Sequence, residues 1–374
     1  MYYRDMNKRT NLHLNFINVF GEESLVEVIE EYKNIEAPSH IIPISNPIAR
    51  FLKGTTYTKY GKLYAITKLN VPGDDFMYFK LVSVVIKSLQ HEIADNPSYK
   101  EQIMKKILHR QFGPMLSALN ELLAAAYYKH LGLDIKLNSS AESGAADVDI
   151  VDTKFATDAK LYPNDRIRLE ALVNESADQL RHFVRKVKDS SILLSVWKPD
   201  KRLFHQALEA LDREFDDIEN FKSYSDEALH AMPIFDNYRG GDYGVRIHEN
   251  NVNIFIQPSW SMDDSIEEMK KSIEKAEQQA AAIGKEAIPW VMVPGDANKH
   301  GIQIQAMRHI AKFHPFIMER KNIYVMPVYS FGFENEKMNF IFDIYQTGSN
   351  IYNINSASFE AFIRSLMDER VVVL

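Results

Sequence analysis

The sequence predicts an α/β protein with more than one folded region. Strand-like and helix-like hydrophobic patterns alternate twice along the chain, over residues 133–197 and again over residues 252–345. This alternation is typical of sheets that are covered by helices. A chain of 374 residues is also too long for one ordinary hydrophobic core, so we expect two domains, or one large domain with an extension.

The composition narrows the classes of function. The sequence contains no cysteine, which excludes disulfides, thiolate zinc sites, iron–sulfur clusters and cysteine nucleophiles. It has no signal-peptide pattern and no apolar run of about 18 residues, so we expect a cytoplasmic protein that does not enter a membrane. The formal net charge of −7 argues against coating nucleic acid by bulk electrostatics, but it is compatible with an enzyme that has a local basic patch.

The first predicted region, residues 1–112, mixes short helices with candidate strands and contains no chemical motif. We expect it to be structural or to position a substrate. A helix rich in leucine and alanine is predicted next, over residues 115–130, with Gly132 closing it. Its apolar residues recur at three- and four-residue steps and form a wide buried face, beside which Glu121 lies.

Three short strands are predicted after this helix, at residues 133–137, 146–152 and 155–161. Only two residues separate the last two strands, so we expect them to form a tight hairpin. Because side chains alternate along a strand, Asp158 and Lys160 share one face of the last strand. Asp147 and Asp149 share one face of its neighbour by the same rule. The Asp-x-Lys triplet alone is a weak motif, since similar triplets occur elsewhere in the chain.

The pairing of these two strands would bring up to three carboxylates and one ammonium group together. Carboxylates a few ångströms apart repel one another, and a hard divalent cation such as Mg2+ or Mn2+ relieves that repulsion. The metal can act as a Lewis acid on a phosphate oxygen and can acidify a bound water molecule. In this arrangement Asp149 and Asp158 hold the metal, and Lys160 supplies positive charge near the attacking water.

These strands resemble the two motif strands of the PD-(D/E)XK nuclease superfamily. The residues that carry the resemblance are 146–151 and 155–161, together with the helix around 120–123. The order of helix, three strands, helix and strand over about residues 113–200 is similar to the core of that family. The resemblance therefore implies a restriction-endonuclease-like mixed sheet flanked by helices.

The resemblance also implies roles for individual residues. Asp149 would be the first-motif aspartate, Asp158 the second acid and Lys160 the lysine of the motif. Glu121 would be the helix glutamate, and the metal ligands would come from these carboxylates and from Asp147. The chain departs from the family pattern because a valine stands where proline is usual, and because Asp147 competes with Asp149 for the first role.

A predicted helix over residues 170–188 concentrates hydrogen-bond donors in an otherwise acidic chain. Gln179, Arg181, Arg185 and Lys186 would contact a phosphate backbone if this helix binds nucleic acid. The alternative is an ordinary solvated helix face. Gln179 also resembles a helix glutamine that some members of the superfamily place near the site.

The predicted function is metal-dependent hydrolysis of nucleic-acid phosphodiester bonds, and the expected enzyme is a DNA endonuclease. Family analogy suggests restriction or antiviral defence as the biological setting. Two alternatives stay open. The fold could be a catalytically inactive scaffold that binds nucleic acid or protein, or an unrelated regulatory protein whose acidic hairpin is a solvated edge.

The predicted boundaries place the nuclease core at residues 113–200, a helical linker at 201–245 and a second α/β domain at 246–374. The C-terminal domain would select substrate, sense a signal, form a homo-oligomer or bind a partner protein.

Overall fold

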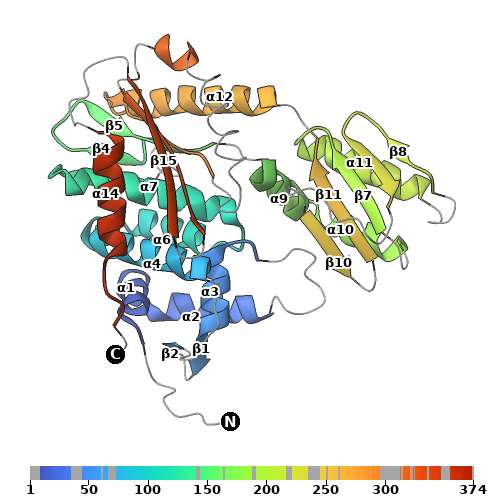
Figure 1. Ribbon diagram of the computed structural model, residues 1–374, viewed down its shortest axis with the longest axis horizontal. Helices are drawn as coiled ribbons and strands as arrows, with labels where there is room; N and C mark the ends of the chain where they lie inside the picture. Colours follow the sequence, from blue (N-terminus) through green and yellow to red (C-terminus); the bar gives the residue numbers. More distant parts are fainter. Residues whose placement is uncertain are drawn as a thin grey trace. The chain divides into compact units, whose positions relative to one another are not determined.

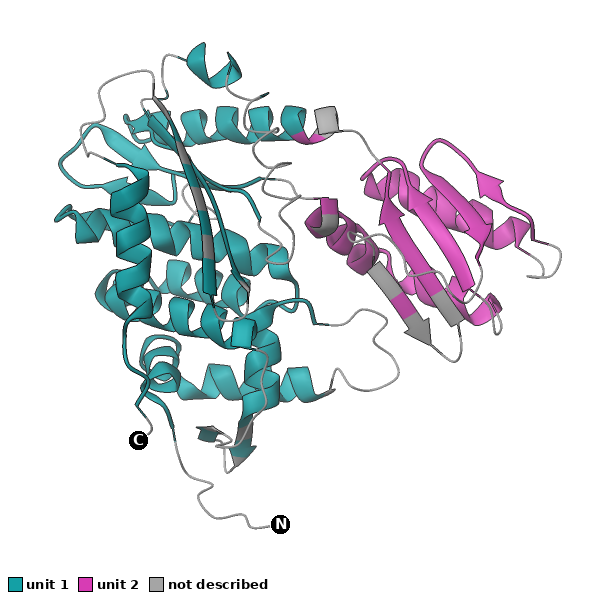
Figure 2. Cartoon of the chain, viewed as in Figure 1, with its two compact units in different colours: residues 1–34, 44–162, 266–374 teal, residues 35–43, 163–265 magenta. Residues whose placement is uncertain are grey.

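The computed structural model divides the chain into two compact units, each described here by itself (Figure 2). Unit 1 comprises residues 1–34, 44–162 and 266–374, and unit 2 comprises residues 35–43 and 163–265. The structure describes residues 9–34, 44–59, 62–65, 73–139, 144–162, 165–187, 191–215, 221–234, 245–249, 252–259, 262–294, 312, 315–320, 323, 325–334, 337–346 and 354–372. Both units combine helices with sheets, which confirms the predicted α/β class.

The N-terminal part of unit 1 is mainly helical. Its helices are α1 (Asn11–Phe20), α2 (Glu22–Asn34), α3 (Pro47–Thr55), α4 (Gly73–Ser88), α5 (Gln90–Ala94), α6 (Pro97–Ile107) and α7 (Phe112–His130), and a small hairpin joins β1 (Thr56–Lys59) to β2 (Lys62–Ala65). Helices α4 and α6 both pack against α7. The region predicted to end at residue 112 is therefore continuous with the central helix of the unit.

The predicted hairpin forms next to α7. Strand β4 (Val148–Ile150) pairs antiparallel with both β3 (Ile135–Leu137) and β5 (Phe155–Thr157). The pairing of β4 with β5 is the one expected from the sequence and is confirmed. The connection from β4 to β5 is longer than expected, and Asp152 within it has a left-handed φ of 55°, which aspartate tolerates better than most residues. Strand β6 (Ala159–Leu161) continues the same segment after a break at Asp158.

The remaining strands of unit 1 come from the C-terminal part of the chain. They are β12 (Glu286–Ala287), β13 (Trp290–Met292), β14 (Val325–Glu334) and β15 (Lys337–Gln346). Strand β12 runs parallel to β5, and β13 runs parallel to both β6 and β14. Strand β15 closes this edge as the antiparallel partner of β14. The amide of Trp290 donates a hydrogen bond to the carbonyl of Asp158, so pairing continues across the break.

Helices cover both faces of this strand arrangement (Figure 1). Tyr128 of α7 shares a hydrogen bond with Thr157 at 2.8 Å between hydroxyl oxygens, which places α7 on the Thr157 face. Ala280 of α12 (Met262–Ala281) packs with Ala156 and two other buried alanines on the opposite face, because neighbouring strand residues point in opposite directions. Such small side chains let α12 approach the sheet closely. Helix α14 (Ser356–Met367) packs against α4, α7 and β15.

Apart from residues 35–43, unit 2 is an insertion between β6 and the part of α12 that belongs to unit 1. Its elements are α9 (Asp165–Glu175), α10 (Ala177–Lys186), β7 (Ser191–Val196), α11 (Lys201–Glu214), β8 (Tyr224–Ser225), β9 (Leu229–Pro233), β10 (Val245–Glu249) and β11 (Val252–Pro258). The strands form one sheet in the order β10-β11-β7-β9-β8. Alternate residues of β7, namely Ile192, Leu194 and Val196, share one core cluster with residues of α9, α10 and α11.

This division corrects the predicted boundaries. Residues 170–197 were expected to complete the core that begins at residue 113, but α10 and β7 belong to the sheet of unit 2. The helix and strands that pack beside β5 and β6 are α12, β12 and β13 instead. The expected linker at 201–245 contains strands β8 and β9, and the expected domain at 246–374 is shared between both units. The sequence pattern of a helix followed by a strand does not show which sheet the strand joins, so the two units could not be told apart from the pattern.

One buried asparagine ties the layers of unit 1 together. Asn120 of α7 donates from Nδ2 to the carbonyls of Lys160 and Trp290, at 2.9 Å each. Its Oδ1 accepts a hydrogen bond of 2.7 Å from the hydroxyl of Tyr329. Asn120 therefore fixes the position of α7 relative to β6, β13 and β14.

Replacement of Asn120 by alanine is expected to lower the free energy of unfolding by about 3 kcal/mol or more, because several buried polar groups lose their partner at once. Asn18→Ala is a matched control, since Asn18 is exposed on α1, and should change stability by less than about 0.5 kcal/mol. Denaturant unfolding measures both. Equal stability of Asn120→Ala and the wild type would contradict the anchoring role.

Candidate functional site

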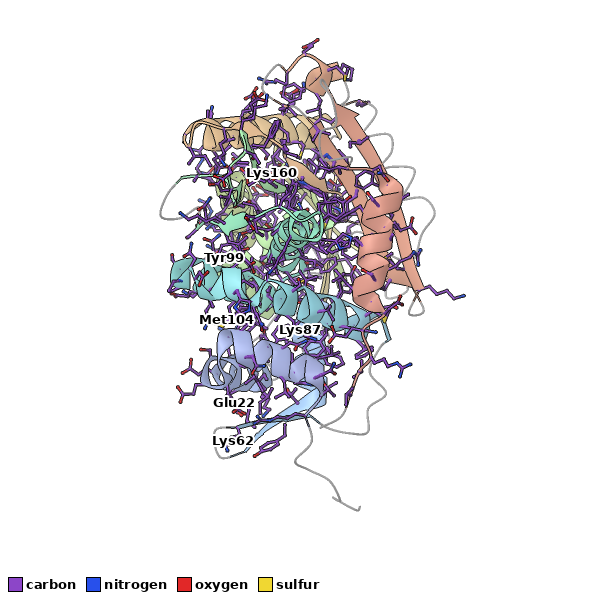
Figure 3. All side chains as sticks on the ribbon, turned by 90° about the vertical axis from the view of Figure 1, so that its left-hand side faces the viewer. Glu22, Lys62, Lys87, Tyr99, Met104 and Lys160 are labelled. Carbon is purple, nitrogen blue, oxygen red and sulfur yellow. The ribbon has the colours of Figure 1, made fainter. Side chains whose placement is uncertain are left out.

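Three acidic and two basic side chains gather around the break between β5 and β6. Glu121 comes from α7, Asp147 directly precedes β4, Asp158 occupies the break, Lys160 lies on β6 and Lys106 extends from α6. The three carboxylate residues are only 1%, 6% and 3% exposed, in the order given. In Figure 3 the labelled Lys160 lies below α12, and the labelled Tyr99 lies on α6. Burial of this much charge in one place is unusual for a purely structural core.

Each carboxylate of this acidic cluster, defined as Glu121, Asp147 and Asp158, has a specific partner. Lys160 Nζ lies 2.6 Å from Asp158 Oδ2, and Lys106 Nζ lies 3.1 Å from Glu121 Oε2. The backbone amide of Ala159 donates to Asp147 Oδ2 at 3.0 Å. The two lysines therefore act as counter-ions. At the break in the strand, Asp147 accepts the hydrogen bond of a backbone amide.

The pKa values of the cluster are strongly perturbed. Burial raises the pKa of Asp158 well above its ordinary range, and the charge of Asp147 raises it further. Burial, together with Asp147, also raises the pKa of Glu121 to about 7. Burial lowers the pKa of Lys106, but the nearby carboxylates, Glu121 first, outweigh that effect and raise it overall. Burial is also the main reason why the pKa of Tyr99 is raised, and the charges of Glu121 and Asp147 add to it.

Asp147 and Asp149, the two candidates for the first-motif aspartate, lie in different surroundings in the structure. Asp147 belongs to the acidic cluster, whereas Asp149 forms an ion pair with Lys285, whose Nζ also donates to the carbonyl of Ile150 at 2.7 Å. Asp149 pairs across the strands with Ala156 and therefore faces α12. Asp147 lies outside the β4 ladder, so the two-residue alternation that would place both aspartates on one face does not apply.

Gln279 is a site residue that the sequence did not indicate. It lies on α12 and is 8% exposed. Lys160 Nζ donates to its Oε1 at 3.3 Å, and its Nε2 donates to the carbonyl of Ala145 at 3.2 Å. The expected helix glutamine, Gln179, lies on α10 in unit 2. No local signal distinguishes these two glutamines, because the choice depends on which helix packs over β6.

The donors predicted to contact phosphate also lie in unit 2. Arg181 donates to Asp178 at 3.0 Å, and Lys186 Nζ lies 2.9 Å from Asp212 Oδ2. Arg185 is exposed on the same helix. Two of these cations are thus neutralised by acidic neighbours, as the solvated-face alternative expects.

The acidic cluster is the candidate site for Mg2+ or Mn2+. Within the described residues, no three His, Cys, Asp or Glu side chains are spaced to hold a metal ion, and Glu121 and Asp158 each face a lysine instead. The donor chemistry fits a hard cation, since every candidate ligand is a carboxylate oxygen. The Glu121 carboxyl is buried, and a hydrogen bond from Tyr99 opposes the rise that burial causes in its pKa.

Comparisons with models of protein families, with curated proteins and with solved structures found no match to this chain. No helix in the described ranges is both long and apolar enough to cross a membrane.

The raised pKa of Glu121 predicts a pH dependence of stability that metal should alter. The ordinary pKa of a glutamate is 4.5. Between pH 4.5 and about pH 7, Glu121 therefore keeps a proton in the folded protein that it has released in the unfolded chain. The contribution of Glu121 to stability therefore falls as the pH rises across this window. Glu121→Gln should remove that fall, and Mg2+ or Mn2+ should stabilise the wild type above about pH 7 more than it stabilises the variant.

Denaturant midpoints in EDTA and in metal, from about pH 5 to about pH 8, measure this difference. Identical stabilisation of wild type and Glu121→Gln by metal would rule out Glu121 as a ligand.

Proposed function

We propose that this chain is a Mg2+- or Mn2+-dependent nuclease that hydrolyses phosphodiester bonds of nucleic acid, and that its substrate is DNA. The observation that carries the proposal is the burial of three carboxylates around the lysine-bearing strand β6. Mutually repelling carboxylates are stabilised by a hard divalent cation. Strongly perturbed pKa values of this kind cluster at functional sites.

The arrangement of elements supports the same proposal. Helix α7, strands β3, β4 and the β5–β6 segment, helix α12 and strand β13 follow one another in the order that the PD-(D/E)XK resemblance implies. Unit 2 interrupts this order between β6 and α12. In this proposal the nuclease core would be discontinuous in sequence and would not be confined to residues 113–200.

The site residues have distinct roles in this proposal. Asp147, Asp158 and Glu121 would supply the oxygen ligands of the metal. When bound, the metal would polarise a phosphate oxygen and acidify a water molecule. Lys160 would place a positive charge beside the developing negative charge. Its ammonium group lies between Asp158 and Gln279 and is therefore oriented before the substrate arrives.

The role proposed for unit 2 follows from its charge. Aspartate and glutamate outnumber lysine and arginine in residues 163–265. Non-specific electrostatic binding of the phosphate backbone is therefore not the function proposed for unit 2. We assign it substrate selection by specific contacts, or binding of a partner protein or a second copy of the chain. A setting in restriction or antiviral defence rests on the family resemblance alone.

Cleavage assays test the proposal directly. Wild-type protein should cleave plasmid, linear duplex or single-stranded DNA, or RNA, in Mg2+ or Mn2+ and not in EDTA. Lys160→Ala should lose about 100-fold or more in cleavage rate, because one preorganised positive charge at the reacting group is removed.

Lys154→Ala is the matched control, since Lys154 lies in the same hairpin but is exposed and pairs with Glu286. It should cleave at the wild-type rate. A fully active Lys160→Ala variant would exclude the proposed role of this lysine. Metal-independent binding of nucleic acid without any cleavage would favour the inactive scaffold.

The two neighbouring aspartates offer a second comparison. Asp147→Asn should lower the metal-dependent cleavage rate by about 100-fold, because an anionic ligand becomes neutral. Asp149→Asn breaks only a partly exposed ion pair with Lys285 and should change the rate by less than about threefold. Rates at saturating Mg2+ decide between them. The reverse order of effects would reassign the first-motif role to Asp149.

A further inference from the structure

The β1–β2 hairpin of unit 1 lies in residues 37–73, the longest stretch of the sequence that contains no aspartate or glutamate. This stretch carries five basic residues, which are Arg50, Lys53, Lys59, Lys62 and Lys68. Three tyrosines, at positions 57, 60 and 64, alternate with the lysines of the hairpin. In a chain whose formal net charge is −7, the hairpin is thus a local concentration of cations and aromatic rings. Such a combination is typical of surfaces that bind nucleic acid.

Strand pairing assigns the residues of the hairpin to two faces. Lys59 pairs with Lys62, and Tyr57 pairs with Tyr64. Residues that pair directly lie on the same face of a sheet, and successive residues alternate between the faces. Leu63 is only 1% exposed, whereas its neighbour Lys62 is exposed. The register therefore places the two lysines and the two tyrosines together on the face away from Leu63.

Two side chains hold β2 in place on the side opposite β1. Glu22 of α2 accepts a hydrogen bond of 2.8 Å from the amide of Leu63, and Arg9 Nε donates to the carbonyl of Leu63 at 3.0 Å. Arg9 also forms an ion pair with Glu22, and its guanidinium carbon lies 5.5 Å from the centre of the Tyr64 ring. The hairpin is therefore fixed on the helices of unit 1, and the labelled Glu22 and Lys62 lie at the same end of Figure 3.

The acidic helix α2 packs against both strands of the hairpin but does not neutralise Lys62. Glu22 and Glu30 of this helix pair with Arg9 and Lys33 instead. Among the residues that the structure describes, none forms an ion pair or a side-chain hydrogen bond with Lys62. An exposed cation that has no partner within the protein is available to an anionic binding partner.

We propose that the β1–β2 hairpin binds duplex DNA, with Lys59 and Lys62 contacting phosphates of the backbone. The choice of DNA rests on the proposed function, but this contact needs no metal. A two-stranded ribbon is narrow enough to enter the major groove, whereas a lipid surface favours a broad basic patch or an amphipathic helix. In Figure 3 the labelled Lys62 lies far from the labelled Lys160. The hairpin would therefore position the substrate without taking part in the chemical step.

Binding of labelled duplex DNA by the full chain, measured by fluorescence anisotropy in EDTA at several salt concentrations, tests this assignment. The double variant Lys59→Gln/Lys62→Gln should raise Kd about tenfold at about 0.1 M salt. It should also reduce the dependence of log Kd on log salt concentration by about two, because two phosphate contacts no longer release counterions. The charge-conserving double variant Lys59→Arg/Lys62→Arg should bind like the wild type, which separates loss of charge from a change in the hairpin.

Lys105→Gln/Lys154→Gln is the matched control, because it removes the same charge from exposed lysines that pair with Glu101 and Glu286. It should match the wild type in both Kd and salt dependence.

An unchanged Kd and salt dependence in the Lys59→Gln/Lys62→Gln variant overturns the hairpin inference and leaves the nuclease proposal intact. A wild type that does not bind duplex DNA, or that binds only vesicles containing phosphatidylserine, overturns the inference as well. Weaker DNA binding by this variant, combined with no cleavage by the wild type in Mg2+ or Mn2+, supports the hairpin inference and overturns the nuclease proposal.

Discussion

The cost of burying three carboxylates in one small region is the constraint on which unit 1 depends. Glu121, Asp147 and Asp158 are nearly inaccessible to solvent, and each would be unstable there without a compensating partner. Lys106, Lys160 and the amide of Ala159 provide that compensation. Replacing such a set with apolar residues is commonly neutral or stabilising in proteins, so stability alone does not account for its presence.

The surrounding fold holds this costly cluster in a fixed geometry. Asn120, next to Glu121 on α7, binds the backbone of both β6 and β13, so the helix that carries one carboxylate is aligned with the strand that carries the lysine. On the other face, alanines at the contact allow α12 to come close enough for Gln279 to reach Lys160. The break at Asp158 releases the amide that Asp147 needs. Packing and electrostatics therefore constrain the same few residues.

Local patterns in the sequence predicted the local parts of this arrangement. The hairpin of β4 and β5 and the buried helix α7 follow from hydrophobic period and short connections, whereas the continuous strand expected over residues 155–161 is interrupted at Asp158. The pairing of β13 with β6 could not be predicted in this way, because its partner lies beyond an inserted unit that repeats the same helix-then-strand pattern. The choice of Asp147 depended on where one strand ends, and a single residue of difference reverses the direction of a side chain.

The insertion of unit 2 also has a consequence for biosynthesis. The ribosome makes Lys160 well before it makes Trp290 and Val291, the residues that pair with β6, because residues 163–265 of unit 2 lie between them. At ordinary rates of translation this delay is on the order of ten seconds. During that time β6 lacks its parallel neighbour and α12 is absent, so the nascent chain carries its acidic residues without the frame that assembles them. The acidic cluster of unit 1 can therefore reach its final geometry only after residues 163–265 of unit 2 have been synthesised.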